Sequence, residues 1–136
     1  MQVYKKILVA IDCSSVDSVI LDHVLSLAIQ NRAKVYLLHI VHSHTLDQDR
    51  ALRMSAEITL QMYCDSLRKS EIEVEYIIRS GEPETEILLE IKANDYDLVA
   101  MATHGHGFFG DLLFGSVSRT LKHKISIPLL LLKPKP

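Results

Sequence analysis

Four of the five glycines lie within one stretch of the chain, from Gly105 to Gly115, and this stretch has the chemistry of an anion-binding loop. Glycine exposes backbone N–H groups, and the N-terminus of a helix adds the positive end of its dipole. An apolar run, residues 98–101, precedes the stretch, and a helical pattern begins at about Ser116 and ends at Lys124. The sequence therefore predicts a strand, a glycine loop that holds phosphate groups, and a helix. A loop that only connects two elements is the alternative.

Asp12 is the second candidate for chemistry, because it directly follows the continuous apolar run of residues 7–11. Such a short, β-branched run predicts a strand buried on both faces. Ser14 or Ser15 can cap the helix that follows, whose apolar positions extend to Ala28. From the residues alone, Asp12 either faces a ligand or caps this helix, and both interpretations stay open.

The rest of the chain alternates between strand and helix patterns. Residues 35–41 predict a strand, about 47–69 an amphipathic helix, and 71–78 a strand with one acidic face. A helix with Pro83 near its start follows and ends at residues 94–97, and residues 129–132 predict a last strand. This alternation predicts an α/β fold: a doubly wound, Rossmann-like parallel sheet of five strands with helices on both faces. The acidic third strand fits an edge, which gives the order 3-2-1-4-5. Asp12 and the glycine stretch then converge at the switch between strands one and four, where such sheets bind ligands.

Composition narrows the class of protein further. A chain of 136 residues predicts a single domain, residues 1–136. The net charge of −2 gives no basic face for nucleic acid, and no apolar run approaches the roughly 18 residues that span a membrane. Cys13 and Cys64 form no CxxC pair, and no export signal is apparent, so reduced thiols and a cytoplasmic location are expected.

Segments along the whole chain resemble the universal stress protein family. They are KKILVAIDCS at 5–14, LLHIV at 37–41, SGEP at 80–83, and the final stretch from Ala102 to Ser118. The final stretch is the most specific, since the ATP-binding branch of that family has the pattern Gly-x2-Gly-x9-Gly-Ser/Thr. Gly105 and the pair Gly115-Ser116 match this pattern, and Ala102 stands at the first glycine position. Its one methyl group weakens binding if the backbone must approach the ligand closely, and is harmless if the site needs only a small residue.

The resemblance implies a homodimeric stress protein that binds ATP without rapid turnover, with Mg or Mn possible beside the phosphates. Asp12 would contact ribose or that metal, Ile40 and Val41 would hold adenine, and Gly105, Gly115 and Ser116 are the strongest phosphate candidates. Ser116 also suits the N-cap of the last helix, and Gly107 also acts as a spacer in the loop. The full set of expected nucleotide contacts is Ala10, Asp12, Ser14, Ile40, Val41, Ala102, Thr103, His104, Gly105, Gly107, Gly115, Ser116, Val117 and Ser118.

The parts of an efficient catalyst are missing from the sequence. It contains no GxxxxGK[ST] motif, no kinase signature set and no GxSxG elbow. Phosphoryl transfer needs a positioned metal, cation and nucleophile, so no enzyme activity is expected, and slow ATP hydrolysis stays open. His42 and His44 repeat the i,i+2 spacing of His104 and His106, but a zinc site needs three or four ligands in fixed geometry, so surface histidines are expected.

The sequence leaves two alternative functions open and predicts one interface. A nucleotide-free dimeric interaction protein would follow if Ala102 marks a degraded site, and a slow ATPase or adenylyl transferase is the third possibility. The apolar strand Pro128–Leu132 is expected at a sheet edge, where pairing of two copies across a two-fold axis would cover it. Phe108 and Phe109 either fold over the nucleotide or pack on the dimer partner.

Overall fold

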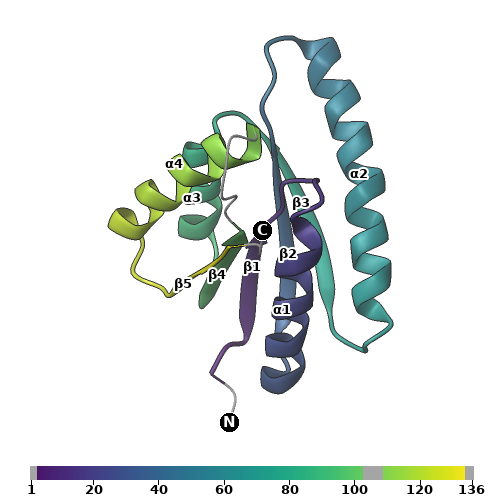
Figure 1. Cartoon of the computed structure of the whole chain (residues 1–136), viewed down its shortest axis with the longest axis vertical. Helices are drawn as coiled ribbons and strands as arrows, with labels where there is room; N and C mark the ends of the chain where they lie inside the picture. Colours follow the sequence, from purple (N-terminus) through teal and green to yellow (C-terminus); the bar gives the residue numbers. More distant parts are fainter. Residues whose placement is uncertain (1–2, 103–108, 134–136) are drawn as a thin grey trace.

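The computed structural model describes residues 3–102 and 109–133, and the side chains of residues 3–102 and 117–133. Strands and helices alternate along it (Figure 1). The strands are β1 (Lys6–Ala10), β2 (Lys34–Val41), β3 (Val74–Ser80), β4 (Leu98–Ala102) and β5 (Leu129–Leu132). The helices are α1 (Asp17–Asn31), α2 (Leu46–Arg68), α3 (Pro83–Ala93) and α4 (Phe109–Lys124).

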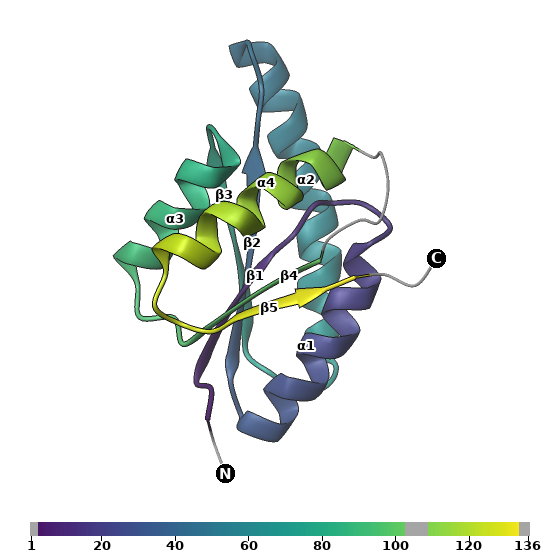
Figure 2. The ribbon, with the colours of Figure 1, turned by 60° about the vertical axis from the view of Figure 1, so that its left-hand side comes forward.

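The strands form one parallel sheet in the order β3-β2-β1-β4-β5, which confirms the predicted fold class and strand order. Residues of β1 alternate between two cores, as a strand buried on both faces requires. Ile7 and Val9 belong to the core under α1 and α2, and Leu8 and Ala10 to the core under α3 and α4. The two pairs of helices therefore cover opposite faces of the sheet (Figure 2).

The helix α4 begins at Phe109, so the predicted helix start at Ser116 is wrong. The prediction treated Gly110 and Gly115 as loop residues, but a glycine inside a helix costs only about 1 kcal/mol relative to alanine. Apolar residues recur at every fourth position from 113 to 121, and this helical pattern outweighs two glycines. Gly115 and Ser116 consequently lie within α4, and Ser116 is not its N-cap.

The strand β3 begins at Val74, three residues later than the alternating pattern suggested. The backbone N–H groups of Ser70 and Glu71 donate to carbonyls at the end of α2, and Glu71 adopts a φ of 63°. The residues after α2 therefore reverse the chain before pairing can start. β3 and β5 are the two edges of the sheet, as predicted, and Leu131 on β5 is 44% exposed.

Candidate functional site

The turn between β1 and α1 is built around one buried carboxylate, that of Asp17. Its Oδ1 accepts a hydrogen bond from the Asp12 N–H at 3.0 Å, and its Oδ2 accepts from the Ser14 N–H at 3.1 Å. The hydroxyl of Tyr63, on α2, donates to the same Oδ2 at 2.8 Å. Asp17 is 1% exposed. A single carboxylate thus fixes the backbone on both sides of Cys13, whose φ of 60° is uncommon for a residue other than glycine.

None of Asp12, Ser14 and Ser15 is the N-cap of α1, so the predicted serine cap is wrong. The N-cap is Val16, which makes no side-chain bond to the helix, and Asp17 in the first turn reaches back to the turn instead. The Ser14 hydroxyl donates to Oδ2 of Asp12 at 3.0 Å, so these two candidate residues contact each other. Two oxygen-bearing side chains are therefore held together just beyond the carboxyl end of β1.

Burial shapes the protonation of this turn. It raises the pKa of Asp17 above its ordinary value, and the Tyr63 hydroxyl and the two backbone donors oppose that rise. Burial, reinforced by the negative charges of Asp17 and Asp12, raises the pKa of the Cys13 thiol to about 12. A thiol with such a pKa stays protonated at neutral pH and does not act as a nucleophile. Burial and the bond to Asp17 also raise the pKa of Tyr63, which keeps the proton that this bond requires.

His39 joins the ends of β1 and β2 beside the Asp12 turn. Its Nδ1 lies 2.8 Å from the Ile11 carbonyl oxygen, and the Ile11 N–H donates to the Leu38 carbonyl at 2.8 Å. A small hollow of about 20 Å³ opens here. Its lining comprises Ala10, Ile11, Asp12, Leu38, His39, Ile40, Pro83 and Ile87. The hollow has room for about one water molecule, so it accounts for only a small part of a nucleotide's volume.

The structure brings several of the predicted site residues together at the carboxyl ends of neighbouring strands. Ala10, Asp12 and Ile40 line the hollow together, and Val41 ends the neighbouring strand β2. Ala102 ends β4, which pairs directly with β1, and its side chain is buried. These described segments therefore meet at the switch between β1 and β4, as the strand order predicts.

The remaining predicted residues fall on α4 or outside the described chain. Val117 is buried in the same core as Ala10 and Met101, so its side chain serves packing. Ser118 is largely buried on the same helix. The described residues do not include Thr103, His104, Gly105, Gly107 and Phe108. Gly115 and Ser116 lie in α4, where backbone N–H groups ordinarily donate to carbonyls one turn earlier.

The described residues contain no group of three or more His, Cys, Asp or Glu side chains arranged to hold a metal ion. The rings of His42 and His44 lie edge to face, with centroids 5.7 Å apart. His42 Nδ1 is 3.3 Å from the Gly81 carbonyl oxygen and 3.7 Å from a Glu82 carboxylate oxygen. A metal held by Asp12 would therefore need further ligands from the nucleotide phosphates. Over the same residues, no helix is long and apolar enough to cross a membrane.

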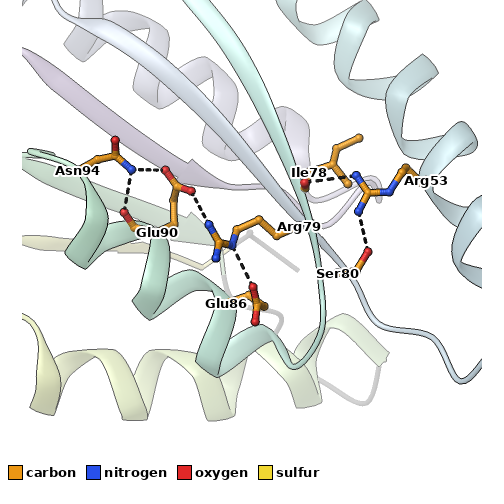
Figure 3. Close-up of polar contacts among 7 residues, drawn as sticks. All are labelled: Arg53, Ile78, Arg79, Ser80, Glu86, Glu90 and Asn94. Atoms are coloured by element: carbon orange, nitrogen blue, oxygen red, sulfur yellow. Dashed lines mark hydrogen bonds and ion pairs between the residues drawn. The ribbon is translucent and has the colours of Figure 1, made fainter.

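Sequence reasoning missed a second buried carboxylate, Glu90 on α3 (Figure 3). Its Oε1 pairs with Arg79 Nη1 at 3.1 Å, and its Oε2 accepts bonds from Asn94 and from the Tyr96 hydroxyl, both at 2.7 Å. Arg79 also pairs with Glu86 at 3.0 Å. The spacing Glu86, Glu90, Asn94 on one side of a helix was the available signal. Arg79 lies on β3 and both glutamates lie on α3, so the cluster fastens α3 to the edge strand β3.

The arrangement defines a class of protein: a doubly wound parallel α/β domain with a polar turn and a small hollow at its topological switch point. The sequence identifies the family within that class to which the chain belongs. Residues 3–133 match the model of the universal stress protein family, and the chain belongs to that family.

Known relatives cover nearly the whole chain. The universal stress protein YxiE of Bacillus subtilis is 24% identical over 147 residues, which include 96% of this chain and 99% of the relative. The solved structure of the protein MJ0577 is 26% identical, covers 98% of each chain and has a TM-score of 0.74. A universal stress protein from Archaeoglobus fulgidus, solved in complex with dAMP, is 24% identical with a TM-score of 0.72 and covers 96% of this chain and 98% of its own.

Proposed function

We propose that this universal stress protein binds ATP at the carboxyl ends of β1, β2 and β4, and that it acts in the stress response as a nucleotide-dependent homodimer. The observation that carries the proposal is the paired Asp12 and Ser14 turn, which lies beside Ile40 at the switch point of the sheet. The complex of the Archaeoglobus fulgidus relative with dAMP supports an adenine nucleotide as the ligand.

Each part of the nucleotide has a candidate partner. Adenine lies against Ile40 and Val41 and takes hydrogen bonds from backbone groups at the end of β2. The ribose hydroxyls donate to the Asp12 carboxylate, whose position Ser14 fixes at 3.0 Å. We assign the phosphates to the stretch 102–116, because it carries the family's phosphate-binding motif. Mg or Mn bound with Asp12 would neutralise part of the phosphate charge.

The protein binds ATP without acting as an efficient enzyme. The thiol nearest the candidate site, Cys13, stays protonated because burial and two carboxylates raise its pKa to about 12. Asp12 is the carboxylate of the described turn that lines the hollow, and it serves the ribose in this assignment. Slow hydrolysis would need a water and a base positioned by the stretch 103–116.

The homodimer forms through the edge strand β5. Leu129, Leu130 and Leu132 are partly buried and Leu131 is 44% exposed, although all four belong to a strand with an open side. Pairing of β5 with β5 of a second copy across a two-fold axis would remove this apolar edge from water.

Isothermal titration with ATP, ADP, AMP and adenosine, each with Mg, tests the proposal. We expect saturable binding that weakens as phosphates are removed. Asp12→Asn should weaken ATP binding at least about tenfold, because the hydrogen bonds of ribose to a charged acceptor are lost. Asp22→Asn, an exposed change of the same kind on α1, should leave the affinity unchanged.

Two results would overturn the proposal. One is the absence of heat at millimolar ATP, together with no nucleotide in the mass spectrum of protein denatured directly after purification; this favours the nucleotide-free interaction protein. The other is release of phosphate or pyrophosphate far above background, which favours an ATPase or adenylyl transferase. Thermal melting of Asp12→Asn must show an intact fold before its affinity is interpreted.

A further inference from the structure

The helix α2 carries an apolar ridge on the face turned away from the sheet. Met54, Ile58 and Met62 are 66%, 66% and 63% exposed, and their spacing of four residues stacks them along one side of the helix. The side chains that α2 buries against the sheet are Ala56, Leu60, Cys64 and Leu67. At 100° per residue, Ile58 points about 200° away from Leu60, so the ridge lies opposite the core.

Figure 1 shows that α2 runs along the outside of the molecule, with α1 and β3 on its inner side. A helix face in this position is ordinarily polar. Three large apolar side chains therefore lie exposed in one row, on a face where polar residues are expected. Methionine suits a contact surface in particular, because its flexible thioether adapts to a partner's shape.

Charged residues continue the ridge at both ends, with opposite signs. Asp47 lies near the N-terminal end of α2 and Lys69 at its C-terminal cap, and both are exposed. Steps of three or four residues connect them to the ridge through Ala51 and Asp65, so all of them share the outer face of the helix. The face thus carries the Asp47 carboxylate at its N-terminal end and apolar side chains in the middle. At the other end lies the Lys69 ammonium group, beyond Asp65, whose carboxylate pairs with Arg68 at 3.7 Å.

This order is complementary to itself when two helices run antiparallel. A two-fold axis beside Ile58 brings together residues whose numbers add to 116. Met54 then faces Met62 of the second copy, Ile58 faces Ile58, and Asp47 faces Lys69. A parallel arrangement would instead place Asp47 against Asp47 and Lys69 against Lys69, and like charges would repel.

We propose that the α2 ridge is a self-association surface, on which a second copy of this chain packs antiparallel about a two-fold axis at Ile58. The ridge belongs to the β3 side of the sheet, and β5 forms the opposite edge, so this contact is separate from pairing through β5. One helix face is smaller than the roughly 800 Å² per partner of a standard interface. Association through it is therefore weak, and it joins molecules or dimers at high protein concentration.

Sedimentation at protein concentrations from micromolar to millimolar tests the surface. We expect the mass-average to rise with concentration in the wild-type chain and to rise less in Ile58→Asp. That difference isolates the ridge from any contact made through β5. The matched control Asp22→Lys changes an exposed charge on α1 and should behave as the wild type.

Two charge variants decide whether the occupant is an antiparallel second copy. Asp47→Lys alone and Lys69→Asp alone each place like charges across the two-fold axis, and each should weaken association about tenfold at low salt. A mixture of the two variants places opposite charges at both contacts, so it should associate more strongly than either variant alone. The proposal is overturned if the mixture behaves as the average of its components, or if Ile58→Asp sediments as the wild type at millimolar concentration.

Discussion

Replacement of Tyr63 by phenylalanine removes one hydrogen bond and little else. The hydroxyl donates to Oδ2 of Asp17 at 2.8 Å, and the ring packs against the core under α1 and α2. A bond to a charged acceptor contributes about 1.5–3 kcal/mol. Tyr63 is only partly buried, so water can replace part of the hydroxyl's role. We therefore expect Tyr63→Phe to lower the free energy of unfolding by about 1.5 kcal/mol at neutral pH, at the lower end of this range.

The effect should depend on pH, with a definite sign. Burial raises the folded-state pKa of Asp17 above the ordinary 3.8, so ionisation of this group costs stability. The contribution of Asp17 to the free energy of unfolding is most favourable below its pKa in the unfolded chain. This contribution is lost as the pH rises through its pKa in the folded protein. The Tyr63 bond lowers the pKa of Asp17 and so offsets part of that loss. The destabilisation by Tyr63→Phe should therefore shrink to about half as the pH falls through the folded pKa, because a neutral bond is about half as strong.

Urea denaturation across a pH series measures the free energy of unfolding of the wild type and of Tyr63→Phe. Tyr76→Phe serves as a matched control from the same core. A double-mutant cycle with Asp17→Asn should give a coupling of about 1 kcal/mol at neutral pH. The reasoning is refuted if Tyr63→Phe is neutral, if its cost does not change with pH, or if the cycle shows no coupling between the two positions.

Three further outcomes are expected. Tyr96→Phe should lower the free energy of unfolding by about 2 kcal/mol in guanidinium titration, because it removes a 2.7 Å bond to the buried Glu90; a cost below about 0.5 kcal/mol would contradict the role given to the hydroxyl. Ala102→Gly should tighten ATP binding severalfold in calorimetry, and an unchanged affinity would show that any small residue suffices there. Leu131→Lys should reduce the mass found by light scattering at micromolar concentration to that of a monomer, and a persistent dimer would exclude β5 as the interface.

The sequence predicted the sheet well because each of its signals is local. Buried strands appear as apolar runs, the edge strand β3 as alternation, and the start of α3 as Pro83. The order of the strands then follows from crossover handedness and from the acidic third strand. The start of α4 was misplaced because glycine content was taken as loop content. A spacing of four between apolar residues was the stronger signal in that segment.

The contacts that build the turn after β1 depend instead on residues far apart. An aspartate in the first turn of a helix is favourable in any protein, because it faces the positive end of the helix dipole. The presence of Asp17 at this position therefore did not indicate its contacts with the turn. Its second role requires Tyr63, 46 residues away, and no periodicity connects the two positions. Strand order therefore predicts where the crevice lies. The geometry of Asp12 within it is set by a carboxylate and a hydroxyl from two different elements. A nucleotide that binds here meets a turn whose backbone is already fixed, so the affinity measured for Asp17→Asn would report how much of the binding depends on that fixed geometry.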